Sequence, residues 1–192
     1  MIEQLINTDI SISLFLNSFH NVFFDVLMSY ISGKFFWIPF YAFLFFLLIK
    51  QNIKNKKKLI ISIISVVLVI VLADQLSVHL FKNVFERLRP CHNPDLKGVL
   101  HTINGKCGGQ FGFISSHAAN VFALAVLLLN IFKNEKLTIS LIVWATIVSY
   151  SRIYLGVHYF GDVLVGAIFG AVIGYAVYGL AKIFSRDSIQ ST

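Results

Sequence analysis

Five long apolar segments constrain this chain more than any other feature of its sequence. They cover residues 35–49, 59–81, 115–132, 137–150 and 162–184. A helix needs about 20 mostly apolar residues to cross the hydrocarbon core of a bilayer, and each segment with its flanks approaches or exceeds that length. Inside a bilayer the backbone must satisfy its own hydrogen bonds, which favours helices. The sequence therefore predicts an all-α integral membrane bundle.

The first 33 residues have a different pattern. Apolar residues recur at helical spacing, but Asn17, His20, Asn21 and Asp25 lie between them. We expect one or two amphipathic helices at the membrane interface, with a polar transmembrane helix as the alternative. The bundle therefore has five or six transmembrane helices, and we treat residues 1–192 as one domain.

Composition supports a membrane protein. Hydrophobic residues make up 57% of the chain and charged residues 13%, whereas soluble domains have roughly 45–50% and about 25%. This excludes a disordered chain and disfavours an ordinary soluble enzyme. We attribute the net charge of +7 to membrane topology and not to nucleic-acid binding, because the most basic stretch, residues 50–58, has no aromatic residues between its lysines.

The basic stretches also predict the orientation. Residues 50–58 carry five lysines and no acid, which is typical of a cytoplasmic loop. Alternating spans then place residues 82–116 and 151–161 outside, and the turn at residues 133–136 and the C-terminal tail inside. We expect a multi-pass protein of the cytoplasmic (inner) membrane, with residues 82–116 as an extracytoplasmic loop facing the periplasm or the exterior.

Three clusters of polar residues lie at the ends of spans, all on that outer side. They are Lys82-x6-Arg89-Pro90, Ser115-Ser116-His117 and Ser151-Arg152-x5-His158-x3-Asp162. Charged residues near hydrocarbon are costly and suggest function. The ammonium and guanidinium groups suit phosphate. Ser115 stands at a helix N-cap position, where backbone N–H groups also favour an anion.

The two histidines suggest acid–base and nucleophilic chemistry. If residues 158–162 are helical, His158 and Asp162 share a face, and the carboxylate can orient the imidazole. His158 is then a candidate nucleophile. His117 remains as a general acid for the leaving group.

Together these motifs resemble the type 2 phosphatidic acid phosphatase superfamily, which includes membrane lipid phosphatases and vanadium haloperoxidases. The first and third motifs match in full. In the second, Ile114 stands where the family has Pro and Ser116 where it has Gly, while Ser115 and His117 match.

The resemblance implies roles for each matched residue. His158 forms a phosphohistidine, Asp162 supports it and His117 is the general acid. The phosphate-binding residues are Lys82, Arg89, Ser115 and Arg152, and Ser116 adds a hydroxyl donor. No metal or cofactor is required.

The resemblance also suggests substrates. The small size and outward-facing site are similar to bacterial undecaprenyl-diphosphate phosphatases. The alternatives in the family act on phosphatidic acid, on phosphatidylglycerophosphate, or on lipid A as phosphatase or phosphotransferase. Outside lipid phosphatases, a haloperoxidase-like enzyme and a catalytically silent lipid-binding or transport protein are alternatives. Monomer and homodimer both stay open.

Other residues have structural interpretations. Cys91 and Cys107 are expected to form a disulfide in an oxidising compartment, with a zinc site that adds His92 and His101 as the alternative. Glycines recur every fourth position at 166, 170 and 174, which predicts close helix packing within the bundle or, less favoured, a homodimer seam. Asp74 and His79 are expected to be buried, where they position Lys82 or hydrogen-bond neighbouring helices.

Overall fold

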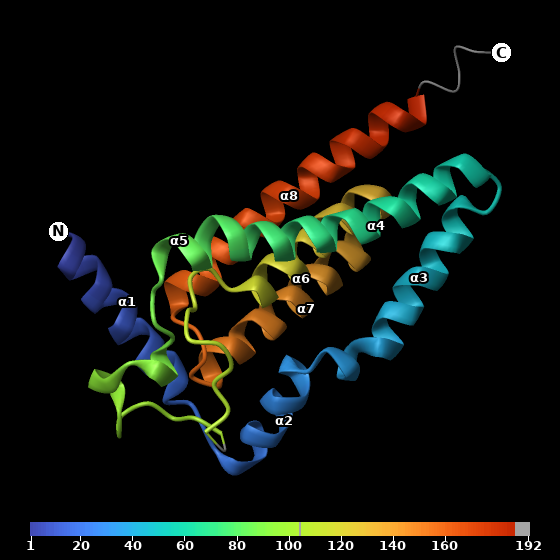
Figure 1. The fold of residues 1–192 in the computed structure, drawn as a ribbon. Helices are drawn as coiled ribbons and strands as arrows, with labels where there is room; N and C mark the ends of the chain where they lie inside the picture. Colours follow the sequence, from blue (N-terminus) through green and yellow to red (C-terminus); the bar gives the residue numbers. More distant parts are fainter. Residues whose placement is uncertain (104, 187–192) are drawn as a thin grey trace.

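The computed structural model describes residues 1–103 and 105–186, and the fold it shows is helical (Figure 1). The α-helices are α1 (Ile2–Asn17), α2 (Val22–Ser32), α3 (Ile38–Asn52), α4 (Lys56–Ser77), α5 (Asn83–Phe85), α6 (Ser116–Phe132), α7 (Glu135–Tyr154) and α8 (Phe160–Arg186). Short 3-10 turns lie at Lys34–Trp37, Pro90–His92 and Pro94–Leu96, and a π-helical turn, Val78–Lys82, joins α4 to α5.

The predicted all-α membrane bundle is confirmed, although the spans are less uniform than the sequence suggests. Four helical stretches are long and apolar enough to cross a membrane: Lys34–Asn52, Lys56–Phe85, Glu135–Tyr154 and Phe160–Ser185. The pair α1 and α2, bent by 114° at its break, would add a fifth. The third predicted span, residues 115–132, forms the shorter α6, which at about 1.5 Å per residue falls short of a hydrocarbon core of about 30 Å.

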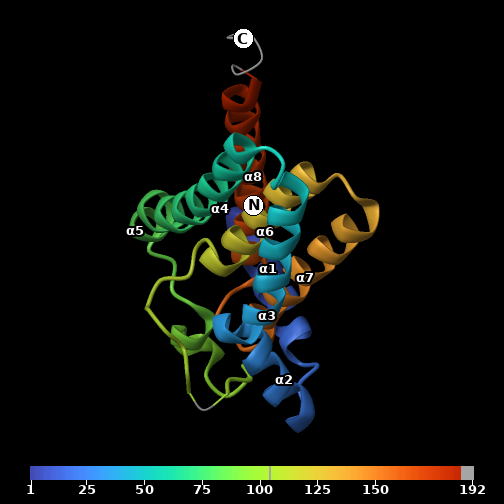
Figure 2. The same ribbon diagram turned by 90° about the vertical axis from the view of Figure 1, so that its right-hand side faces the viewer.

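Helix α6 lies at the centre of the bundle, surrounded by α4, α7 and α8 (Figure 2). Its small and aliphatic residues explain this position, because Ala118, Ala119, Ala123, Ala125 and Leu127 are fully buried. Small side chains let neighbouring backbones approach closely. Since α6 carries two residues of the second polar motif, its central position brings that motif toward the other two.

The glycine stripe of α8 faces α6. A Cβ atom on Gly166 would lie 2.7 Å from the carbonyl oxygen of Ser115, and those on Gly170 and Gly174 would run into the carbonyls of Ala119 and Ala123. The predicted close packing inside the bundle is therefore confirmed, and the stripe is not free to form a homodimer seam. Because α8 begins at Phe160, the stripe includes Asp162 but not His158.

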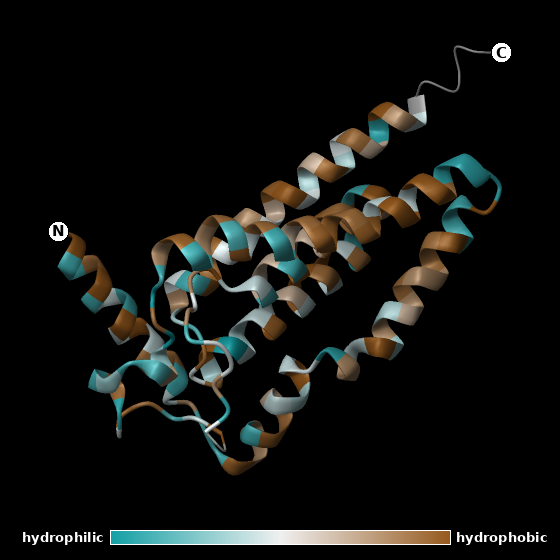
Figure 3. Ribbon diagram, viewed as in Figure 1, coloured by the Kyte–Doolittle hydropathy of each residue, from teal (hydrophilic) through white to brown (hydrophobic). Residues whose placement is uncertain are grey.

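Helix α3 stands apart from the other spans in Figure 1. It meets α7 through aromatic rings: Trp37, Phe40 and Tyr41 pack around Trp144, with ring centroids 5.2–6.0 Å apart. Between α3 and the helices α4, α6 and α7 lies a cavity of about 720 Å³. The cavity therefore has apolar helices on both sides, as the hydropathy colours show (Figure 3).

The loop between α5 and α6 is shorter than the predicted 82–116. Helical structure continues to Phe85, because the π-helical turn and α5 prolong α4, and Ser116 already belongs to α6. A disulfide joins Cys91 to Cys107, with Cα atoms 5.9 Å apart, and Leu88 pairs with Phe111 in an isolated β-bridge. The zinc alternative does not fit, because both thiols are in the disulfide.

Candidate active site

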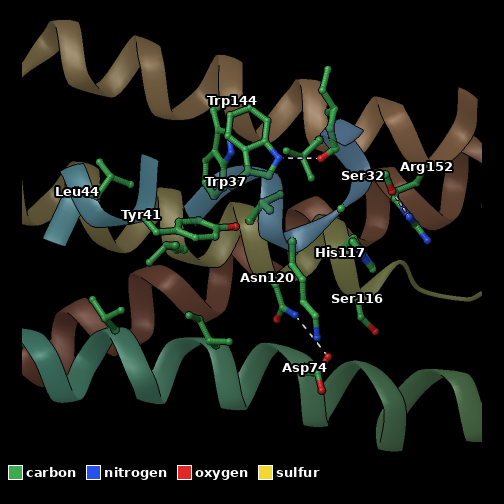
Figure 4. Close-up of a pocket in the computed structure, with 18 of the residues that line it drawn as sticks. Ser32, Trp37, Tyr41, Leu44, Asp74, Ser116, His117, Asn120, Trp144 and Arg152 are labelled. Atoms are coloured by element: carbon green, nitrogen blue, oxygen red, sulfur yellow. Dashed lines mark hydrogen bonds between the residues drawn. The ribbon is translucent and has the colours of Figure 1, made fainter. Parts of the chain in front are cut away.

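The three polar motifs meet at the end of the cavity nearest the α5–α6 loop. Six of the predicted site residues line it: Lys82, Arg89, Ser116, His117, Arg152 and His158. Figure 4 shows Ser116, His117 and Arg152 beside the apolar wall formed by Trp37, Tyr41 and Leu44. Ser115 and Asp162 are fully buried at the starts of α6 and α8. The basic side chains of Lys82, Arg89 and Arg152 and two imidazoles therefore share one end of a cavity whose walls are mainly apolar.

His158 precedes α8 and contacts Asp162, which lies in the first turn of that helix. The Nδ1 atom of His158 lies 3.3 Å from Oδ2 of Asp162, which also accepts a hydrogen bond from the backbone N–H of Tyr159 at 3.0 Å. The segment from His158 to Asp162 is not one continuous helix, because α7 ends at Tyr154, Gly156 takes a left-handed φ of +68° and α8 begins only at Phe160; a left-handed residue commonly ends a helix. The turn nevertheless sets the imidazole against the carboxylate.

The environment of His158 favours a neutral imidazole. Its side chain is 1% exposed, and burial lowers the pKa of His158 well below its ordinary value, with the charges of Arg89, Arg152 and Lys82 acting in the same direction. With Nδ1 directed at Asp162, the Nε2 lone pair is the one left for a substrate. A buried, oriented and uncharged imidazole is suited to nucleophilic attack on phosphorus.

The basic residues are each fixed by a different element. Arg89 donates from Nε to the carbonyl of Phe111 at 3.2 Å and so lies across the loop. Lys82 donates to the hydroxyl of Ser116 at 2.7 Å. Arg152 donates to the hydroxyl of Ser32 at the end of α2. Such groups suit a phosphoryl group, whose transfer depends mainly on positioning and electrostatic stabilisation.

The two serines of the second motif have different positions. Ser115 is the N-cap of α6, as predicted, and its hydroxyl accepts from the N–H of Ala118 at 3.4 Å. Ser116 lies in the cavity wall, where its hydroxyl contacts Lys82 and, at 2.6 Å, the hydroxyl of Ser77. The serine that replaces the family's glycine therefore supports a basic residue.

We expect Ser116→Ala and Ser116→Gly to keep activity and to raise KM by about 2–10-fold, because one hydrogen bond contributes roughly 0.5–1.5 kcal/mol and Lys82 keeps its charge. Initial rates across substrate concentrations measure this. A loss of more than 100-fold in kcat would contradict it and would mean that the hydroxyl contacts the reacting phosphoryl group.

Sequence reasoning missed several residues around the site. Gly112 packs so closely that a Cβ atom would lie 3.0 Å from Cγ of Arg89 and 3.1 Å from Oδ2 of Asp162. Arg87 pairs with Asp162 at 3.0 Å and with Asp9 of α1 at 2.7 Å. The only sequence signal for Arg87 is its place beside the first motif, and Asp9 has none.

Asp74 hydrogen-bonds a neighbouring helix, as one of the two expectations had it, whereas His79 differs from the prediction. Asp74 lines the cavity and accepts from the amide of Asn120 at 3.4 Å (Figure 4). His79 is exposed, because the π-helical turn carries its side chain away from the bundle. His101 lies on the far part of the loop, stacked on His20 and 2.9 Å from Asp25. Within residues 1–103 and 105–186, no three His, Cys, Asp or Glu side chains are grouped to hold a metal ion.

Comparisons with known proteins agree with this geometry. A family model described as the PAP2 superfamily matches residues 63–184. The chain is 39% identical over 183 residues to a lipid A 4'-phosphatase of Bacteroides thetaiotaomicron, covering 94% of this chain and 80% of the relative. It is 36% identical over 177 residues to a lipid A 4'-phosphatase of Porphyromonas gingivalis, covering 92% of this chain and 74% of that relative.

Solved structures share the fold. A transmembrane PAP2-type phosphatidylglycerolphosphate phosphatase from Bacillus subtilis has a TM-score of 0.69 at 23% identity, over 95% of this chain and 89% of that one. Aquifex aeolicus LpxE has a TM-score of 0.60 at 23% identity, over 88% of this chain and 94% of that one. The family match, the similar sequences and the shared fold all lead to one assignment: this chain belongs to the PAP2 superfamily and is a multi-pass membrane lipid phosphatase.

Proposed function

We propose that this enzyme hydrolyses the 4'-phosphate ester of lipid A at the extracytoplasmic face of the membrane. The observation that carries the proposal is its similarity, 39% identity over 94% of the chain, to a lipid A 4'-phosphatase. Undecaprenyl diphosphate, the substrate first expected from the small size and the outward-facing site, has no comparable support, so the lipid A alternative is the better interpretation.

The proposed reaction has two steps. Nε2 of His158 attacks the phosphorus, the bond between phosphorus and the lipid oxygen breaks, and His117 donates a proton to that oxygen. Water then attacks the phosphohistidine, the N–P bond breaks, inorganic phosphate leaves, and His117 accepts the proton of the water. The positive charges of Lys82, Arg89 and Arg152 stabilise the transferring group in both steps.

The cavity supports a lipid substrate. Beyond the basic cluster its walls are mainly apolar and come from different helices: Ile31, Tyr41, Leu44, Val66, Leu124 and Val148. A phosphate held by the cations would leave the attached acyl groups along α3. Burial of hydrocarbon on such walls contributes roughly 25 cal/mol per Å².

Charge distribution supports the orientation. The lysine-rich turn between α3 and α4 lies at the opposite end of the bundle from the α5–α6 loop (Figures 1 and 3). A cytoplasmic position for that turn, by the positive-inside rule, would make the site extracytoplasmic.

Phosphate release in detergent tests the substrate. We expect lipid A to give inorganic phosphate in the presence of a chelator, and mass spectrometry of the product to show loss of the 4'-phosphate. Undecaprenyl diphosphate, phosphatidic acid and phosphatidylglycerophosphate serve as competing substrates, each expected to react at least 10-fold more slowly. Faster release from any of these three would overturn the lipid A assignment. Loss of the lipid phosphate without inorganic phosphate would indicate transfer to another acceptor.

A further inference from the structure

Helix α1 presents a polar stripe to the segment that carries His158. Asp9, Ser13 and Asn17 are four residues apart, so they lie on one helix face. Ser13 and Asn17 are 3% and 2% exposed, while apolar residues of α1, such as Leu5 and Phe15, are exposed. The polar stripe of Asp9, Ser13 and Asn17 is therefore turned toward the protein, while apolar residues of α1 lie on its exposed side.

Each residue of the stripe bonds the backbone near His158. Asp9 accepts from the N–H of Gly161 at 2.7 Å, and Ser13 accepts from the N–H of Phe160 at 2.8 Å. The amide of Asn17 donates to the carbonyl of Tyr154 at 2.7 Å. The bonded N–H groups belong to the first turn of α8 and the carbonyl to the last turn of α7, and such groups have no partner within their own helix. Helix α1 thus caps the helices on both sides of His158.

Arg87 links this stripe to the carboxylate behind His158. One terminal nitrogen of its guanidinium lies 2.7 Å from Oδ2 of Asp9 and the other 3.0 Å from Oδ1 of Asp162. The guanidinium also lies over the ring of Tyr159, 4.0 Å from its centroid. The side chain is therefore held on three sides.

The bonds of Asp162 are divided between its two oxygens. Oδ1 accepts from Arg87, whereas Oδ2 faces His158 and accepts from the N–H of Tyr159. The side chain of Asp162 is 0% exposed, so no bulk water can replace a lost partner. Without Arg87, one oxygen of a buried carboxylate would lose its charged partner, and the carboxylate could rotate away from the imidazole.

We propose that Arg87 is a positioning residue, held by Asp9 of α1, that fixes the Asp162 carboxylate so that it orients His158. The inference rests on the proposed histidine mechanism. It makes the N-terminal helix, which lies outside the residues 63–184 that match the family model, a part of the catalytic apparatus. Arg87 is not among the described residues that line the cavity, so it should affect turnover and not substrate binding.

The test separates kcat from KM. Arg87→Met keeps the length of the side chain and removes its charge, and we expect kcat to fall about 10–100-fold with KM within 2-fold, because small displacements of a reacting group cost about that much. Arg87→Lys keeps a positive charge that can form one ion pair, and its kcat should be at least 3-fold higher than that of Arg87→Met. Asp9→Asn should lower kcat less than Arg87→Met does. In the double variant, Asp9→Asn should lower kcat little further than Arg87→Met alone, because both changes act through the carboxylate of Asp162.

A matched pair on α1 controls for general damage. Ser11 is exposed. Among the described residues, its hydroxyl bonds only the carbonyl of Asn7 in the same helix. Ser11→Ala should therefore leave kcat unchanged. Ser13→Ala, two residues further along and on the buried face, should lower kcat about 3–10-fold. Elution on gel filtration and thermal unfolding in detergent establish that every variant is folded.

The two proposals fail separately. If the wild type releases phosphate from another lipid but not from lipid A, the substrate assignment is wrong, and the Arg87 series is measured on that lipid. A folded Arg87→Met variant with wild-type kcat, or with a raised KM alone, overturns the positioning role. Failure of Arg87→Lys to recover activity overturns it as well. A wild type that is inactive on all four lipids overturns both proposals.

Discussion

Replacement of His158 by alanine is expected to lower phosphate release by at least about 10⁴-fold while the protein stays folded. The alanine variant lacks the proposed nucleophile, and loss of a nucleophile removes a transition-state interaction that binding alone cannot replace. The remaining cations, Lys82, Arg89 and Arg152, still hold phosphate, so KM should change little. Initial rates of inorganic phosphate release in detergent, with a chelator present, measure the loss.

His79→Ala is the matched control for this change. His79 is exposed and lies on the same side of the bundle as the α5–α6 loop, but it is not among the described residues of the cavity wall. Its replacement should leave the rate within 2-fold of wild type.

A second readout is the intermediate itself: wild-type enzyme quenched in alkali during turnover should carry phosphate on histidine, and His158→Ala should not. A folded His158→Ala variant that keeps more than 1% of the rate would assign the nucleophile to another residue.

The motif spacing predicted the parts of the site that depend on short stretches of chain. Lys82 and Arg89 lie at the same cavity end as Ser116, His117 and His158, although the motifs are tens of residues apart. The contact that a helical His158–Asp162 segment would give is present, although the segment is not one continuous helix. Gly156 follows the end of α7, and the turn after it, not helical periodicity alone, brings the two side chains together.

The partners of Asp162 could not be predicted in the same way. Arg87 is 78 residues from Asp9 and 75 from Asp162 in sequence, and no local pattern states which cation meets which carboxylate. Apolar residues recur at helical spacing in this region with polar residues between them, which predicted an amphipathic helix. The pattern does not state what the polar residues contact: in this membrane protein Asp9, Ser13 and Asn17 bond backbone groups of α7 and α8, where unsatisfied donors and acceptors are costly.

A single methyl group at Gly170 is expected to be the most destabilising small change in the bundle. The added Cβ would run into the carbonyl oxygen of Ala119 in the backbone of α6, and a helix backbone cannot move aside as a flexible side chain can. Overpacking of this kind costs about 1–3 kcal/mol, and we expect Gly170→Ala at the upper limit. Gly170→Val, with two further methyl groups, should prevent recovery of a monodisperse protein.

Gly179 of the same helix provides the control, because a Cβ there would meet no described atom within 4 Å. In a chain of this size 1 kcal/mol shifts Tm by about 2–4 °C, so Gly170→Ala should lower Tm by about 6–12 °C in detergent while Gly179→Ala should leave it within 2 °C. Equal Tm values for the two variants would contradict the close packing of α6 on α8.

The same contact should also affect catalysis. Ser115 of α6 donates its backbone N–H to the carbonyl of Asp162 at 2.9 Å, and α6 carries His117 while the turn before α8 carries His158. The distance between the two imidazoles is therefore set by how closely the two helices pack. We expect any Gly170→Ala protein that folds to lose at least 10-fold in kcat, whereas Gly179→Ala should keep the wild-type rate. A folded Gly170→Ala variant with full kcat would mean that the site tolerates a wider separation of α6 and α8 than the direct hydrogen bond between them implies.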